Sequence, residues 1–373
     1  MRSSLLNVQE IERQKAITTP SPPSSSSLPV IEALPNPSDI KRIAGTPNAA
    51  GSTGYINRHS GWTNAEAAMI FLRAKVEATQ RITFLTGTVT RLIFSSTGTS
   101  VRGAEYTPFS ANTTTTASTQ TATADLTILA AGAWSPTLID LRGRVRTTAQ
   151  CMAYIPLTHA EAAHLSALPP QLNLTTGLFY IPPAPPQDGA KSEQSYLKVA
   201  RHAHGLSNPL TIPHPEPHLS KAHITISVPA SHTAIPASAA HELRTFTQHV
   251  FAGTELCERA YTHVRLCHYA DTPEGDFVVD YVPQYNDTLF IATGGSGHAF
   301  KFAPVLGEAV VQRIMRTGPA EFAERWVWKA ERKEGEWSVE DGSRGGEKGL
   351  ILAEEMEKGV VEGEATKKAM AKL

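Results

Sequence analysis

Cysteine is scarce in this chain: 373 residues contain three, at Cys151, Cys257 and Cys267. An odd, sparse set excludes a scaffold held by disulfides and favours a reducing compartment. No segment approaches the ~20 continuous apolar residues of a membrane-spanning helix, so no membrane association is expected. The 34 basic and 35 acidic residues nearly cancel, leaving a formal charge of -1, and this balance gives no reason to expect binding to nucleic acid.

Several catalytic signatures are also missing. The chain has no H-E-x-x-H and no C-x-x-C, so no metal is expected, and it has no G-x-S-x-G elbow of a serine hydrolase. The first fifteen residues lack the apolar core of a secretory signal. The G-x-G-x-x-G dinucleotide fingerprint is absent too, because the glycines near 45–54 follow no predicted strand.

Composition changes at both ends. Residues 1–53 include the Pro/Ser-rich run TTPSPPSSSSLP and are predicted to be low-complexity and mostly disordered. Residues 331–373 form a tail rich in Gly, Lys and Glu, predicted to be exposed and largely disordered from 340 onward. Overall, 41% of residues are apolar, which is enough for a sizeable core.

The stretch 60–78 predicts a helix that begins at a capping box made by Thr63 and Glu66. Its buried stripe is expected to comprise Ala68, Phe71, Leu72 and Val76. Strands are predicted at 82–85, 88–94 and 101–106, followed by a polar surface loop at 110–124.

Two segments predict a strand, a small-residue turn and a helix. The run 126–131 reads as a strand buried on both faces, and the segment 289–315 repeats the pattern. Small residues let the backbone approach a ligand, and a helix N-terminus attracts anions. The spacing alone leaves a plain connector open as the alternative. The turn residues are Ala131, Gly132 and Trp134 in the first segment, and Gly294, Gly295 and Gly297 in the second.

The middle of the chain changes character. Segments with alternating polarity predict an antiparallel sheet in a substrate-binding domain at 151–272, with a helix at 239–251. The fold class is therefore α/β, in which a discontinuous nucleotide-binding domain at 54–150 and 273–330 is interleaved with this sheet.

Five side chains could carry chemistry. Lys198 and His202 are four residues apart in a strand, hence on one face, where Lys198 points either into a cavity or to solvent. His298 and Lys301 share one face at a helix start, as a buried cation pair for an anionic substrate or as two surface residues. Cys267 is either a reactive thiol or an inert core residue.

Five blocks of sequence, spanning roughly 54–328, resemble the FAD-dependent amine oxidases related to monomeric sarcosine oxidase, and most closely the fungal fructosyl-amino acid oxidases (amadoriases). The blocks are GYINRHSGWTNAEAAM, ADLTILAAGAWSPTLIDLRGRV, LKVARHAHG, RLCHYADTPEGDFVVDY and ATGGSGHAFKFAPVLGE. The resemblance implies a monomer that oxidises the C–N bond of a secondary amine with O₂ and releases H₂O₂. Fructosyl-amino acids lead as substrates, followed by sarcosine, pipecolate or saccharopine.

The resemblance also implies roles for individual residues. Cys267 matches the cysteine that carries FAD through a thioether. Lys198 matches the lysine that promotes reaction of reduced flavin with oxygen, and His202 matches the nearby active-site histidine. His298 and Lys301 match the segment whose lysine binds the substrate carboxylate, and His298 is expected to be catalytic. Both residues, together with Ala131, Gly132, Trp134, Gly294, Gly295 and Gly297, match cofactor-binding positions.

The chain departs from this pattern at one point. The family begins with a βαβ unit bearing G-x-G-x-x-G, and here the Pro/Ser-rich segment stands in its place, so the FAD-binding Rossmann-like domain is predicted to be incomplete. The alternative function is a truncated, non-catalytic homologue that binds no FAD. The terminal Ala371-Lys372-Leu373 resembles a peroxisomal address, with a cytoplasmic location as the alternative.

Overall fold

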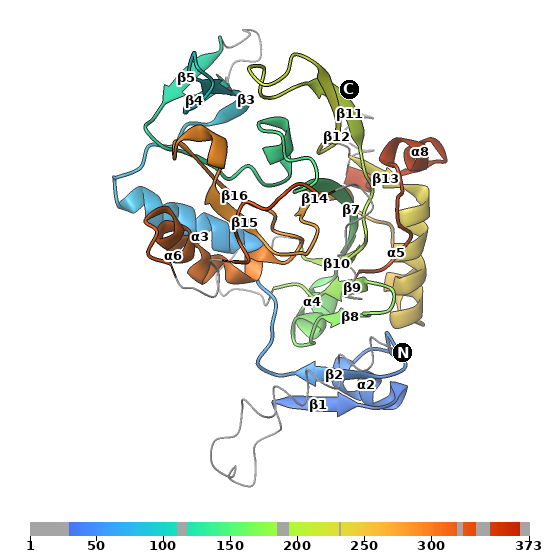
Figure 1. The fold of residues 1–373 in the computed structure, drawn as a ribbon. Coiled ribbons are helices and arrows are strands. Elements are labelled where there is room, and N and C mark those ends of the chain that lie inside the picture. Colours follow the sequence, from blue (N-terminus) through green and yellow to red (C-terminus); the bar gives the residue numbers. More distant parts are fainter. Residues whose placement is uncertain are drawn as a thin grey trace, which may run out of the picture.

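The computed structural model describes residues 30–109, 118–184, 194–230, 233–318, 324–332 and 344–365. Figure 1 shows a central antiparallel sheet with α5 on one side, a second unit built around β15 and β16, and a small unit of β1, α2 and β2. Within the described segments, no helix is both long and apolar enough to cross a membrane.

The central sheet has five antiparallel strands in the order β14-β7-β10-β9-β8. Its buried core lies between the sheet and α5, whose Leu243, Phe246 and Val250 are buried. This confirms the antiparallel sheet and the helix predicted in the middle of the chain. The elements are β7 Arg146–Pro156, α4 His159–Ser166, β8 Gln171–Leu172, β9 Leu178–Ile181, β10 Tyr196–Arg201, α5 Ala237–Val250, η2 Glu255–Cys257 and β14 His263–Asp271.

The second unit joins two small sheets. A sheet in the order β15-β16-β6 contains one parallel pair, β16 with β6, and β3, β4 and β5 form an antiparallel meander. Because β6 and β16 are parallel neighbours, the small-residue turns that follow them lie at the same end of the sheet. Its elements are β3 Gly87–Phe94, β4 Val101–Pro108, β5 Gln120–Thr123, β6 Thr127–Leu129, η1 Gly132–Thr137, β15 Val278–Tyr281, η3 Pro283–Tyr285, β16 Leu289–Thr293, η4 Ala299–Phe302 and α6 Ala303–Ile314.

A β-hairpin extends from the central sheet toward this unit. It consists of β11 Pro209–Pro213 and β12 His223–Ser227, paired antiparallel. The predicted strands at 88–94 and 101–106 are confirmed as β3 and β4. The predicted polar loop at 110–124 contains strand β5, and its residues 110–117 lie outside the described part.

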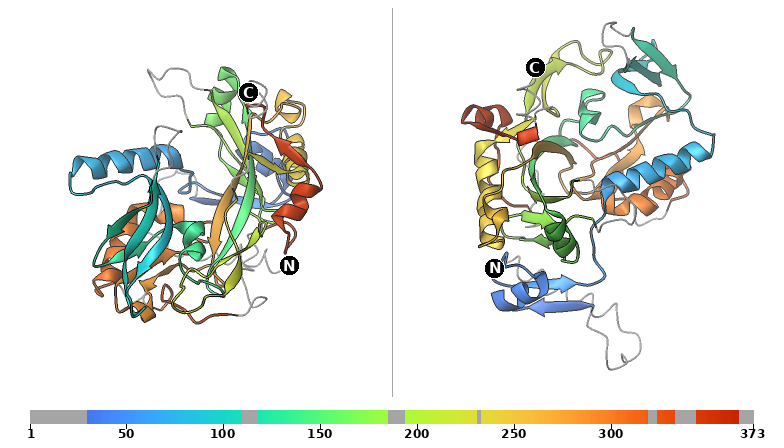
Figure 2. Two further views of the ribbon diagram at one scale, coloured as in Figure 1. Left: turned by 90° about the horizontal axis from the view of Figure 1, so that it is seen from above. Right: turned by 180° about the vertical axis from the view of Figure 1, so that it is seen from behind.

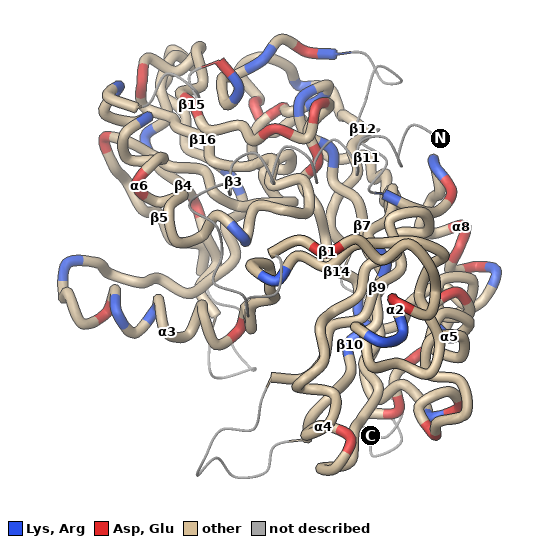
Figure 3. The backbone as a smooth tube through the Cα atoms, turned by 90° about the horizontal axis from the view of Figure 1, so that it is seen from below, with Lys and Arg blue, Asp and Glu red and all other residues tan. Residues whose placement is uncertain are grey.

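Helix α3, Ala65–Ala78, differs from its prediction in start and burial. Asn64, not Thr63, caps it, because its side-chain oxygen accepts the Ala67 N–H at 3.1 Å. None of its residues is buried, and Phe71 is 64% exposed. In Figures 2 and 3 the helix projects from the body of the unit. Helical periodicity shows which face of a helix is apolar, but not whether another element packs against that face.

Two strand predictions on the same side were also wrong. Residues 82–85 have no strand partner and are exposed, including Phe84 and Leu85. The run 126–131 was expected to be buried on both faces, yet β6 is the edge strand of its sheet and Ile128 is 48% exposed. A continuous apolar run shows that a strand can be buried, not that both of its neighbours are there.

The N-terminal segment is ordered from residue 30, which corrects the prediction of disorder up to 53. Strand β1, Ile31–Leu34, pairs with β2, Gly54–Asn57, beside α2, Pro37–Ala44. Asn36 caps α2, a proline opens it, and Gly45 ends it in the left-handed region at φ 65°. These capping signals lay hidden in Pro-rich sequence. Residues 1–29 lie outside the described part.

The C-terminal segment 344–365 also folds, which corrects the prediction of a disordered tail. It contains α8, Leu352–Glu357, and β17, Val360–Glu362, which pairs antiparallel with β13, Ala234–Pro236. Leu352 is buried in the core of the central sheet. A few apolar residues between the charges are enough to dock this segment. Residues 333–343 and 366–373, with the terminal tripeptide, are outside the described part.

Candidate functional site

One face of the central sheet carries the polar side chains. Residues directly opposite each other in neighbouring strands share a face, and the register pairs Lys198 with Tyr154 and Cys267 with Gln150. Because side chains alternate along a strand, these four project to one side of the sheet. Val199, Ala153 and Leu266 project to the other side, into the core beneath α5.

Lys198 is partly buried on this face, and its surroundings perturb its charge. Burial is the main cause that lowers the pKa of its ammonium group, and Arg265 lowers it further, while Cys267 opposes both effects. The predicted alternative of a solvent-facing lysine on an edge strand does not hold, because β10 lies between β7 and β9. A desolvated lysine can change protonation state more readily than an exposed one.

His202 lies just beyond β10 and contacts β14. Its Nδ1 is 3.2 Å from the hydroxyl of Tyr269, two residues along the strand from Cys267 and therefore on the same face. Burial, and then Cys267, raise the pKa of Tyr269 to about 12, with Arg344 opposing. The phenol therefore stays protonated at neutral pH and can donate to Nδ1, which leaves the proton of a neutral imidazole on Nε2.

A buried ion pair missed by the sequence analysis closes this end of the sheet. Arg344 donates to both carboxylate oxygens of Asp271, at 2.9 and 2.7 Å, and to the Ser296 carbonyl oxygen at 3.2 Å. Asp271 also accepts from the Thr148 hydroxyl at 2.8 Å. The Arg344 guanidinium lies 5.5 Å from the ring centre of Tyr269. No signal in the Gly- and Lys-rich sequence around Arg344 marked it as buried.

The glycine loop after β16 lies against the same residues. The Ser296 N–H donates to the Ala270 carbonyl oxygen at 2.9 Å, which holds the loop on β14. A Cβ on Gly297 would come within 2.6 Å of the Tyr269 ring, so this position requires glycine. The structure therefore brings Gly294, Gly295 and Gly297 beside the polar face of the central sheet.

The turn after β6 meets this loop from the other side. The Thr293 hydroxyl donates to the Gly132 carbonyl oxygen at 3.1 Å, so the two strand ends lie together. Gly132 adopts φ +53°, and a Cβ built there would have no atom within 4 Å. Ala131 is partly buried against the core, whereas Trp134 is 50% exposed. Open space at a glycine turn leaves room for a ligand against the backbone.

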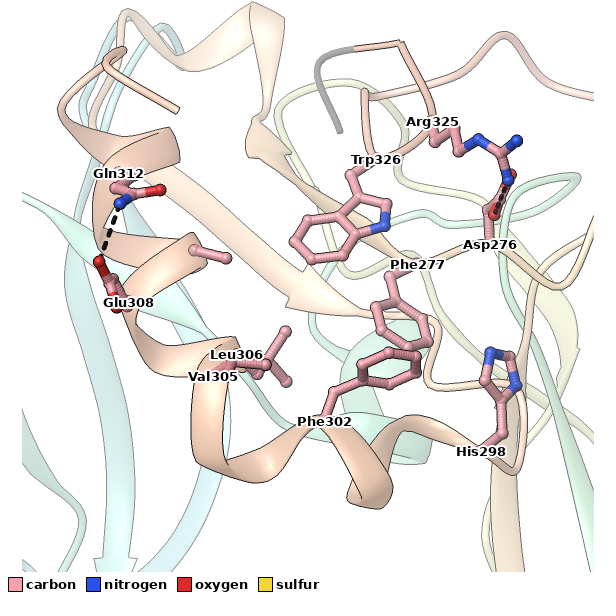
Figure 4. A pocket seen from close by; sticks show the side chains of 11 residues that line it. Asp276, Phe277, His298, Phe302, Val305, Leu306, Glu308, Gln312, Arg325 and Trp326 are labelled. Atoms are coloured by element: carbon pink, nitrogen blue, oxygen red, sulfur yellow. Dashed lines mark hydrogen bonds and ion pairs between the residues drawn. The ribbon is translucent and has the colours of Figure 1, made fainter. Parts of the chain in front are cut away.

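His298 and Lys301 both lie next to Phe302, but they do not form the predicted buried cation pair. The His298 ring packs 5.2 Å from the ring of Phe277 and lines a cavity of about 360 Å³ whose other walls include Phe302 and Trp326 (Figure 4). Lys301 is exposed, with Nζ 5.3 Å from the Phe302 ring centre. The alternative of a buried cation pair is wrong because the Lys301 side chain is exposed; residues 299–302 form a short 3₁₀ turn at the surface before α6 begins.

The three cysteines differ in environment. Cys267 is partly exposed on the polar face. Cys151 is buried on the opposite face, and burial, aided by Glu242, raises the pKa of its thiol to about 12. Cys257 is partly exposed near the end of α5, where its Sγ lies 3.0 Å from the Phe251 carbonyl oxygen. Among the described residues, no cluster of His, Cys, Asp and Glu could hold a metal ion.

Two small-residue turns lie together at the ends of parallel strands, beside a sheet face that carries cysteine, lysine and histidine side chains, an arrangement typical of nucleotide-cofactor sites. The chain belongs to the family of FAD dependent oxidoreductases, whose description matches residues 22–313. The mixed α/β fold with antiparallel sheets is that of the amadoriases.

Known relatives fit this family. The amino acid oxidase imqH of Aspergillus flavus is 31% identical over 320 residues, which cover 76% of this chain and 63% of the relative. The amino acid oxidase fsqB of Aspergillus fumigatus is 28% identical over 72% of this chain and 59% of its own length. The chain thus spans less than two thirds of either relative.

A solved structure gives the same result. The fructosamine oxidase Amadoriase II of Aspergillus fumigatus superimposes with a TM-score of 0.70 at 26% identity, over 87% of this chain and 72% of that protein.

Proposed function

We propose that this protein serves as an FAD-dependent oxidase acting on the C–N bond of a secondary amine. The observation that carries the proposal is the placement of Cys267 and Lys198 on one partly buried sheet face, beside the two glycine turns. The relatives are named amino acid oxidases and a fructosamine oxidase, and both names describe amine oxidation. A fructosyl-amino acid is the leading substrate, and sarcosine-like amines follow.

The residues present fit the flavin ring. The open turn at Gly132 and the loop of Gly294, Gly295 and Gly297 offer backbone without side chains in the way, and Cys267 offers a thiol for covalent attachment. Ala131 and Trp134 complete this contact region. FAD, when bound, supplies a two-electron acceptor that O₂ reoxidises, with H₂O₂ as product.

Lys198 and His202 then act on protons near the ring. Lys198, whose pKa is lowered, would place its cationic ammonium group where negative charge develops during reaction with O₂. His202, held through Nδ1 by Tyr269, presents Nε2 as a hydrogen-bond donor toward the substrate side. Both side chains stand on rigid strands or strand ends, which favours fixed geometry.

Lys301 serves substrate binding in this proposal, and His298 stands nearby. Lys301 is exposed at the end of η4, where it can reach a substrate carboxylate through solvent-accessible space. The Nδ1–H of His298 donates to the Ser296 carbonyl oxygen at 3.1 Å and so supports the glycine loop. Because the His298 ring packs on Phe277, we assign it a positioning rather than a proton-transfer role.

The nucleotide half of the cofactor needs more than the described residues offer. We propose that a further βαβ unit completes this domain beside β6. Support comes from the free edge of β6 and from the exposed apolar side chains of α3 and α6, among them Phe71, Val305 and Val311. Exposed apolar surface of this extent on neighbouring elements marks a contact surface.

The test is whether flavin is attached covalently to the chain at Cys267. The chain is expressed, precipitated with acid and washed, and the visible spectrum of the pellet is recorded for the wild type and for Cys267→Ser. Cys257→Ser is the matched control, because that thiol is also partly exposed but lies on another element. The same samples are then prepared with the N-terminal βαβ unit of a relative co-expressed.

Yellow colour that stays in the wild-type and Cys257→Ser pellets and vanishes in Cys267→Ser supports the proposal. Colour only in the presence of the added unit supports both the site and its completion by a βαβ unit. Colourless pellets under every condition would refute covalent flavin at Cys267. If free FAD also failed to bind, the non-catalytic alternative would replace the proposal.

A further inference from the structure

A glutamate is buried where the β11–β12 hairpin meets the second unit. Glu216 is 1% exposed and lies in the connection between the two strands. One carboxylate oxygen accepts the backbone N–H of Asp140 at 2.7 Å, and the other accepts the hydroxyl of Tyr285. Burying a carboxylate is costly unless both oxygens are hydrogen-bonded, and here both are.

Its two partners lie in the second unit, in segments next to η1 and β16. Asp140 follows η1, the turn that carries Gly132 and Trp134. Tyr285 is fully buried at the end of η3, directly before β16 and the glycine loop that follows it. Glu216 therefore joins the β11–β12 hairpin to the segment that follows η1 and to η3, which precedes β16 and lies at the opposite end of that strand from the glycine loop.

Histidines surround this contact and fix its geometry. His214 lies between the partners: its Nδ1 accepts the Glu216 N–H at 3.1 Å, and its Nε2 is 3.3 Å from Asp140 Oδ2. His218 Nε2 lies 3.4 Å from the Tyr285 hydroxyl. The His218 ring packs 4.5 Å from the ring of Phe94 on β3, so the meander sheet joins the cluster.

Asp140 is held on its other side by an arginine. Although burial opposes its ionisation, the hydrogen bonds from Arg142 hold the pKa of Asp140 below its usual value. Arg142 donates to Asp140 Oδ2 at 2.6 Å. The backbone N–H that Glu216 accepts therefore belongs to a residue that is itself fixed in place.

We infer that Glu216 is a positioning residue, a clamp that fixes the β11–β12 hairpin against two segments of the second unit, the one that follows η1 and the one that precedes β16. An apolar residue of the same size would fill the space at lower desolvation cost, but it would not fix the orientation of three segments through directed hydrogen bonds. The clamp is inferred from the hydrogen bonds alone, whereas any role for it in catalysis rests on the proposed function.

The first test measures hydrogen exchange at the Asp140 amide. Glu216→Leu removes both acceptor oxygens, and we expect protection at Asp140 to fall about tenfold, the effect of losing one hydrogen bond. Glu216→Gln keeps one carbonyl oxygen and should restore most of the protection. Thr225→Val is the control, because it removes only the hydroxyl contact to Thr211, at 3.0 Å, within the same hairpin.

The second test follows the Tyr285 phenol by ultraviolet absorbance at alkaline pH. Burial, and then the hydrogen bond to Glu216, raise the pKa of this phenol. In Glu216→Gln the phenolate should therefore form at lower pH, and subtraction of the Tyr285→Phe spectrum assigns the signal. A merely space-filling glutamate would leave this titration unchanged.

The outcomes are distinct. Loss of Asp140 protection in Glu216→Leu, its recovery in Glu216→Gln and an earlier phenol titration establish the clamp. Unchanged exchange at Asp140 together with an unchanged Tyr285 titration would overturn it, even if one variant folded poorly, because Glu216→Gln is nearly isosteric. Neither readout uses flavin, so failure of the clamp and failure of the proposed oxidase activity can be told apart.

Discussion

Replacing Arg344 by methionine should destabilise the protein by about 3–5 kcal/mol, the cost of breaking a buried ion pair from one side. The side chains of Arg344 and Asp271 are only 5% and 2% exposed, so solvent cannot screen the charge that remains. After the substitution, the Asp271 carboxylate would keep only the Thr148 hydroxyl as a partner among the contacts described above. The methionine fills most of the volume, so the loss is electrostatic rather than a cavity.

The assay is urea unfolding followed by tryptophan fluorescence and by limited proteolysis of the C-terminal segment. Arg316→Met is the matched control, because the Arg316–Asp287 pair is 65% and 57% exposed and should cost under about 1 kcal/mol. Combining Arg344→Met with Asp271→Asn should recover part of the loss, since the orphaned charge is removed as well. A cost for Arg344→Met as small as the control's would refute the view that the pair is buried and coupled.

Four other predictions concern single residues or short segments. Lys198→Met should slow the reaction of reduced flavin with O₂ by about 100-fold or more while sparing flavin reduction in stopped-flow traces. In the wild type, the rate of reaction with O₂ should fall as pH rises through the lowered pKa of Lys198, because the cation is lost there. A rate that does not change with pH would contradict the assignment. Cys151, with its pKa of about 12, should react with iodoacetamide at pH 8 about a thousandfold more slowly than an ordinary thiol. Peptide mass spectrometry measures this rate, and rapid labelling would mean that Cys151 is not buried. Lys301→Met should raise KM about fivefold for a carboxylate-bearing substrate but not for its amide, since the side chain is exposed, and equal effects on both would remove the carboxylate role. Deleting residues 371–373 should abolish import of a tagged chain into peroxisomes, and retained import would discard that address.

Part of the polar face could be predicted because strand alternation is a local property, and the spacing of Lys198 and His202 placed both on one face. That Cys267 on β14 shares this face depends on the register of β14 and β10 with β7, which the sequence did not show. The glycine turns could also be predicted, because glycines cluster after an apolar run. The structure gives a reason for one of these glycines, since only a residue without Cβ fits against Tyr269 at Gly297.

What could not be predicted depends on distant partners. Phe71 lies on a sound helical stripe but has no sheet to cover it among the described residues. Glu216 and Arg344 read as ordinary surface charges, and only the fold brings them to Tyr285 and Asp271. Charge in a sequence therefore says little about burial until the opposite charge or donor is placed beside it.

The docking of residue 344 also has a consequence for synthesis of the chain. The carboxylate of Asp271 at the end of β14 is made 73 residues before the guanidinium that neutralises it. Until residue 344 has left the ribosome, the end of the central sheet at Asp271 must stay open to water, or the Asp271 carboxylate is buried without its partner. Closure of this end of the sheet therefore comes late in synthesis, and slow translation beyond β16 would prolong the state in which Asp271 lacks its partner Arg344.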